Sequence, residues 1–112
     1  MSITLGERCL SALAINFSTT LTTLLLDNNK LSGKISTEIG NLINLERLDM
    51  WNNNLSGNIP SEIGKLQKLQ FLALDTNNLY GYIPSSIGNL TILTNLYLDQ
   101  NNLEGSIPLS LS

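Results

Sequence analysis

The chain has 112 residues, a formal net charge of −3 at pH 7 and 13% charged residues, and it contains no histidine. This length fits one domain, and the sparse charge without a Lys/Arg run argues against a nucleic-acid or anionic-membrane surface. Without histidine, HExxH zinc sites, Ser-His-Asp triads and Cys-His pairs are excluded, so we expect no enzyme, no metal site and no cofactor.

Residues 1–20 show no clear element and are assigned as an irregular segment or as the degenerate tail of a preceding repeat. Glu7 and Arg8 stand where the apolar region of a signal peptide should begin, so a cleaved signal is not expected. No apolar run approaches the roughly 20 residues of a membrane span. Cys9 is the single cysteine of the chain and cannot form an internal disulfide.

From residue 21 onward the sequence repeats itself with a period of 24 residues. The units are residues 21–44, 45–68, 69–92 and 93–112, the last one truncated. Each unit opens with LxxLxL, an alternation that predicts a short strand with one buried face. We expect these strands to pair in parallel from unit to unit, with the rest of each unit as the crossover, which predicts a right-handed solenoid.

The expected core consists of the apolar columns of this repeat. They are Leu24, Leu26, Leu31, Ile35, Leu48, Met50, Leu55, Ile59, Leu72, Leu74, Leu79, Ile83, Leu96, Leu98, Leu103 and Ile107.

Three further columns have a physical interpretation. An asparagine follows each strand, and its amide can pair with backbone groups of adjacent coils. A glycine column allows a tight bend, and a proline column favours the start of a short helical turn. Ser36 replaces proline in the first unit, where we expect a looser turn. The columns are Asn29, Asn53, Asn77 and Asn101; Gly33, Gly57, Gly81 and Gly105; and Pro60, Pro84 and Pro108.

The pattern LxxLxLxxNxLSGxIPxxIGxL over residues 21–112 resembles the plant-specific class of leucine-rich repeats. The resemblance implies an α/β repeat solenoid with a parallel concave sheet, short 3-10 turns on the convex side and a second small sheet from the LSGxIP segments. Such proteins typically carry paired-cysteine caps, which Cys9 does not match, and the chain has no HRD or DFG kinase signature. We therefore expect it to be an internal piece, or a truncated product, of a longer ectodomain.

The outward strand positions form the expected concave face, which contains five acidic residues and one basic residue, a formal charge of −4. Trp51 stands at the seventh place of its unit, where the other units have aspartate. Arg47 and Phe71 are expected cross-strand neighbours within reach of a cation–π contact. Such a face suits a polar or basic polypeptide. The candidate ligand-binding residues are Arg47, Asp49, Trp51, Phe71, Asp75, Tyr97 and Asp99.

Simpler interpretations stay open for these residues. Scattered exposed aromatic side chains are normal on protein surfaces, and aspartate at the seventh place can cap the following turn. Tyr80 and Tyr82 point outward in the LYGYIP segment and are a candidate lateral contact. Three N-glycosylation sequons begin at Asn16, Asn54 and Asn89.

The resemblance is to ectodomains of leucine-rich-repeat receptor-like kinases and receptor-like proteins of the immune or developmental kind. It implies a non-enzymatic recognition module, outside the cell or at its surface, that binds a peptide, a protein or a co-receptor on the concave face. Two alternatives are a free-standing cell-wall inhibitor of the polygalacturonase-inhibiting type and a structural spacer without its own ligand.

Overall fold

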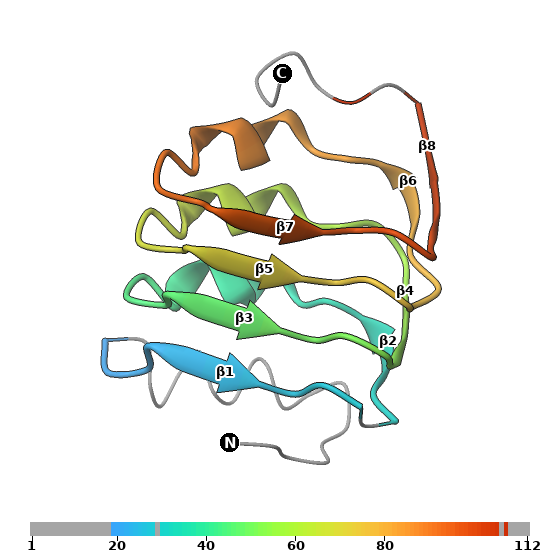
Figure 1. The fold of residues 1–112 in the computed structure, drawn as a ribbon, viewed down its shortest axis with the longest axis horizontal. Helices are drawn as coiled ribbons and strands as arrows, with labels where there is room; N and C mark the ends of the chain where they lie inside the picture. The colour runs from blue at the N-terminus through green and yellow to red at the C-terminus, as the bar shows by residue number, and fades with distance from the viewer. Residues whose placement is uncertain (1–18, 29, 106, 108–112) are drawn as a thin grey trace.

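The computed structural model describes residues 19–28, 30–105 and 107 as a stack of coils with one parallel sheet along its front (Figure 1). The sheet contains β1 (Thr23–Leu25), β3 (Arg47–Asp49), β5 (Phe71–Ala73) and β7 (Asn95–Tyr97), in this order and all parallel. Equivalent residues of successive units are paired, for example Leu24 with Leu48 and Leu48 with Leu72. The predicted parallel solenoid is confirmed.

The LSGxIP segments form a second, lateral set of strands at one end of the coils (Figure 1). It is split into two parallel pairs, β2 (Ser32–Lys34) with β4 (Asn54–Ser56) and β6 (Tyr80–Tyr82) with β8 (Asn102–Glu104). Backbone hydrogen bonds from Asn78 N–H to the Leu55 carbonyl (2.8 Å) and from Tyr80 N–H to the Gly57 carbonyl (3.0 Å) still connect the two pairs.

In the part of the chain that the structure describes, three 3-10 helices cover the opposite side of the sheet: η1 (Thr37–Asn41), η2 (Ser61–Lys65) and η3 (Ser85–Asn89). Pro60 and Pro84 precede η2 and η3 with φ of −71° and −65°, values that the proline ring favours. Ser36 takes this place before η1, and its Oγ accepts a hydrogen bond from Glu38 N–H at 3.2 Å. The expected looser turn is wrong, because the serine hydroxyl caps a helix of the same five-residue length.

The core lies between the sheet and the 3-10 helices. Every expected core residue from Leu24 to Leu79 is buried, together with Ile39, Leu42, Ile63 and Leu66 on the helix side. Ile83, Leu96, Leu98 and Leu103 are only partly buried. Ile107 is 68% exposed, so its assignment to the core is wrong. The reason is positional, since no described strand packs on the outer side of β7 or β8.

The side-chain amides of the asparagine column form hydrogen bonds with backbone groups in the turn between the two sets of strands. Asn53 Oδ1 accepts from Leu31 N–H (3.1 Å), and its Nδ2 donates to the carbonyls of Leu26 (2.9 Å) and Met50 (3.0 Å). Asn77 and Asn101 repeat this arrangement one and two coils further on. These bonds join adjacent coils through a single side chain. Asn29 and Pro108 lie outside the described residues.

Left-handed backbone occurs at two places in each turn. The residue before the column asparagine has φ between 54° and 59°, at Asn28, Asn52, Thr76 and Gln100. The glycine column has φ between 76° and 84°, which a residue without Cβ adopts at no steric cost.

Candidate ligand-binding site on the concave face

A hollow of about 230 Å³ opens on the exposed face of the four-stranded sheet. Strands β3, β5 and β7 and the residues that follow β3 and β5 supply its lining: Asp49, Trp51, Phe71, Ala73, Asp75 and Tyr97. Since these residues come from three adjacent parallel strands, the 24-residue register brings them together. Five of the seven residues predicted for ligand binding therefore line one hollow.

Arg47 lies beside this hollow. Its guanidinium Cζ is 3.8 Å from the centre of the Phe71 ring, so the predicted cation–π contact is confirmed. Arg47 Nη2 is also 3.6 Å from Asp49 Oδ2. The Phe71 ring meets Tyr97 on the next strand, with ring centres 5.5 Å apart and a tilt of 51° between the planes. Asp99 does not line the hollow.

Ala73 is the lining residue that the sequence did not identify as part of a site. It stands at an outward position, yet it is only 3% exposed, because it lies between the larger side chains of Asp49 and Tyr97 in the register of the sheet. A small residue between two larger ones leaves space above it, and Ala73 is the floor of the hollow. A usable signal was the small side chain at a place where the other units have Leu25, Asp49 and Tyr97.

The two carboxylates of the hollow differ in their surroundings. Asp49 pairs with Arg47, and its Oδ1 accepts a hydrogen bond from Trp51 N–H at 3.2 Å. Burial raises the pKa of Asp75 above its ordinary value of 3.8. A backbone hydrogen bond lowers this pKa, and the negative charges of Asp99 and Asp49 raise it further. No Lys or Arg of the described residues lies within ion-pair distance of Asp75.

The two remaining aromatic walls are accessible to a ligand. Trp51 is 41% and Tyr97 43% exposed, and Asn95 Nδ2 donates to the Tyr97 hydroxyl at 3.3 Å. Rigid, amphipathic aromatic side chains of this kind are enriched in binding hot spots.

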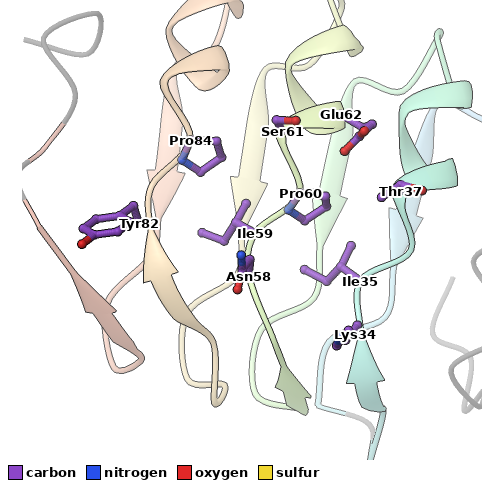
Figure 2. Close-up of a pocket in the computed structure, with 10 residues that line it drawn as sticks. All are labelled: Lys34, Ile35, Thr37, Asn58, Ile59, Pro60, Ser61, Glu62, Tyr82 and Pro84. Atoms are coloured by element: carbon purple, nitrogen blue, oxygen red, sulfur yellow. The ribbon is translucent and has the colours of Figure 1, made fainter.

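A second groove, of about 480 Å³, lies on the lateral and convex side, where residues of the first three coils line it (Figure 2). Pro60, Pro84 and Ile59 contribute apolar surface there, and Lys34 and Glu62 contribute charge. Tyr80 and Tyr82 are 50% and 68% exposed on β6, as expected for outward residues.

The sequon residues Asn54 and Asn89 are exposed, on β4 and at the end of η3, while Asn16 lies outside the described residues. Within residues 19–28, 30–105 and 107, no group of three or more Cys, Asp or Glu side chains is placed to hold a metal ion. None of the described helices has the length and apolar character that crossing a bilayer requires.

A family model for a leucine-rich repeat region matches residues 9–108. Together with the parallel sheet, the asparagine column and the 3-10 turns, this match shows that the chain belongs to the leucine-rich repeat family. A search of curated protein sequences found no match.

Solved structures with the same fold include plant proteins. The plant peptide hormone receptor RGFR1, in complex with RGF2, is 41% identical with a TM-score of 0.80, over 81% of this chain and 15% of that one. The BIR3–SERK2 complex from Arabidopsis thaliana gives 34% identity and a TM-score of 0.83, over 99% and 61%. A plant ice-binding protein gives 37% identity and a TM-score of 0.78, over 81% and 30%. The chain thus spans less than two thirds of each of these proteins.

Proposed function

We propose that this chain is a non-enzymatic recognition module of a plant leucine-rich-repeat receptor ectodomain, located outside the cell or at its surface. Its concave face binds a peptide, a protein or a co-receptor. The observation that carries this proposal is the hollow on the sheet, where Trp51 and Tyr97 stand exposed beside two carboxylates on a rigid parallel scaffold.

The similar proteins support a role in recognition. RGFR1 was solved with the peptide RGF2, and BIR3 with SERK2, so the same repeat serves a peptide hormone receptor and a protein–protein complex. The similarity to a plant ice-binding protein shows that the repeat alone does not define a receptor. The concave hollow is the feature that favours a receptor over a spacer, because a spacer needs no exposed aromatic cluster.

The test separates the concave face from the lateral face. Linear peptides are selected from a random display library on the chain, and their affinities are measured for variants by biolayer interferometry. The double variant Trp51→Ala/Phe71→Ala should weaken binding at least about tenfold, as expected when hot-spot side chains are truncated. The matched control Tyr80→Ala/Tyr82→Ala removes two exposed aromatic side chains from β6 and should leave the affinity unchanged.

Circular dichroism and thermal melts check that both variants fold like the parent chain. The proposal would be overturned if only the lateral variant, Tyr80→Ala/Tyr82→Ala, lost binding. It would also be overturned if the concave variant, Trp51→Ala/Phe71→Ala, bound the peptides as tightly as the parent chain. In either case a spacer, or a protein that uses its lateral surface, would explain the chain better.

A further inference from the structure

The walls of the concave hollow have a chemistry that is narrower than general peptide binding. Three aromatic side chains, Trp51, Phe71 and Tyr97, line it together with the carboxylates of Asp49 and Asp75. Aromatic faces and carboxylates share one preference: both attract cations, the first through the ring quadrupole and the second through charge.

The structure already contains one example of a cation bound to this surface. The guanidinium of Arg47 lies 3.8 Å from the centre of the Phe71 ring while it also pairs with Asp49 at 3.6 Å. An aromatic ring and a carboxylate of this face therefore have the spacing that a planar guanidinium requires.

Asp75 is the carboxylate that remains for an incoming cation. It is partly buried, it lies near Asp49 and Asp99, and no described Lys or Arg pairs with it. A neutral apolar group in the hollow would take more water from this carboxylate without giving it a partner, and an anion would meet a face with a formal charge of −4.

From these observations we propose that the hollow binds one basic side chain, arginine in preference to lysine, presented by an extended polypeptide segment lying on the concave face. This inference rests on the proposed function and names its ligand class. Asp75 accepts the hydrogen bonds of the guanidinium, and Trp51 and Tyr97 flank its planar faces. Arginine is preferred because its guanidinium is planar, stacks on aromatic rings and binds a carboxylate with two parallel hydrogen bonds.

The size of the hollow agrees with this occupant. At about 230 Å³ it accommodates a single long side chain, and its floor is the methyl group of Ala73 rather than a polar group. The alkyl stem of an arginine can pack on this apolar floor while the charged end reaches the carboxylate.

The experiment uses Trp51 as its own reporter, because it is the single tryptophan of the chain. The indole N–H signal of Trp51 is followed by NMR during titration with acetyl-Gly-Arg-Gly-amide. The same titration with acetyl-Gly-citrulline-Gly-amide provides a neutral probe of nearly the same shape. The arginine peptide should give a saturable shift and the citrulline peptide none.

Two variants locate the charge that matters. Asp75→Asn should weaken binding of the arginine peptide about tenfold, the effect of removing one charged hydrogen-bond acceptor. The matched control Glu46→Gln removes one carboxylate from the same face but outside the hollow, and it should weaken binding less than about twofold. Spectra of backbone amides distant from the site show that both variants stay folded.

Three results would overturn the inference: an equal response to both peptides, no response to the arginine peptide, or equal losses in Asp75→Asn and Glu46→Gln. The last result would mean diffuse attraction by the acidic face. These results are separate from failure of the proposed function. If library-selected peptides bind through Trp51 and Phe71 without any enriched basic residue, the concave face is still a recognition surface and only the basic-side-chain inference fails.

Discussion

At the scale of single residues, the asparagine after each strand joins adjacent coils through hydrogen bonds of its side chain. Asn53 makes hydrogen bonds with backbone groups of Leu26, Leu31 and Met50. An apolar side chain at this position would leave these backbone groups without the amide as a partner. We expect Asn53→Ala to lower the free energy of unfolding by about 1–3 kcal/mol, the cost of buried polar groups without partners. Urea unfolding measures this change. The exposed Asn78→Ala serves as control, and a variant of Asn53 as stable as the parent would show that water replaces the amide.

Thr76 is a residue in an unfavourable backbone conformation. Its φ is 57°, a left-handed value that asparagine tolerates and a β-branched residue rarely adopts. Asparagine stands at this place in Asn28 and Asn52, whose side chains are joined by a 2.6 Å hydrogen bond. We expect Thr76→Asn to raise the stability by about 1 kcal/mol, measured as a higher urea midpoint. Thr22→Asn, at an exposed position without positive φ, should give no gain. A destabilised Thr76→Asn would mean that the threonine side chain makes a compensating contact.

Asp75 predicts a pH dependence of stability. Its pKa is raised in the folded chain by burial and by the charges of Asp99 and Asp49, so the folded state holds the proton more tightly than the unfolded state. The resulting stabilisation is fully present below the ordinary pKa of 3.8 and is lost as the pH rises through the folded-state value. Asp75→Asn should therefore melt at a higher temperature than the parent at about pH 7, with the difference gone at about pH 3. A variant that is less stable at both pH values would mean that the backbone hydrogen bond of Asp75 outweighs its desolvation.

At the scale of elements, the close stacking of the 3-10 helices depends on glycine. A Cβ at Gly64 would lie 2.6 Å from Cβ and 2.7 Å from the carbonyl oxygen of Ser86, whose Oγ donates to the Ser61 carbonyl at 2.7 Å. Gly64→Ala should therefore force η2 and η3 apart and cost about 1–3 kcal/mol. Thermal melts compare this variant with Lys65→Ala, a substitution at the next residue of the same helix, whose side chain is exposed. Equal melting temperatures would show that the two helices separate freely.

The elements also show what the sequence could and could not predict. The parallel sheet and its register followed from the period of 24 and from the alternation of residues such as Leu48 and Met50, because these are properties of one unit repeated. The cap by Ser36 was missed because a serine hydroxyl can replace the fixed φ of proline, a substitution that a column of identical residues does not show. The hollow above Ala73 was missed because it depends on the sizes of side chains on neighbouring strands, which no single unit contains. The contact of Arg47 with Phe71 was predictable, since register alone places them opposite each other.

At the scale of the whole molecule, each coil is stabilised mainly by the coils on its two sides, so that position in the stack decides how deeply a residue is buried. Leu48 and Leu72 are fully buried in the middle of the sheet, whereas Leu96, in the same column on β7, is only partly buried. Strands β3, β5 and β7 line the concave hollow, so its walls come from the two central strands and from one outer strand of the described sheet. Binding across it would connect the outer coil to the central ones.

The same substitution at two places of one column tests this dependence on position. Leu72→Ala should lower the free energy of unfolding by about 2–5 kcal/mol, the usual range for a fully buried leucine. Leu96→Ala should lower it by about 1–2 kcal/mol, because the side chain of Leu96 buries less apolar surface on folding. Urea unfolding gives both values, and equal m-values show that both variants unfold from a similarly compact state. Hydrogen exchange adds an independent measurement, in which the amides of β3 and β5 should exchange more slowly than those of β7. Equal costs together with equal protection would mean that the coils unfold as one cooperative unit and that β7 is as deeply packed in solution as β5.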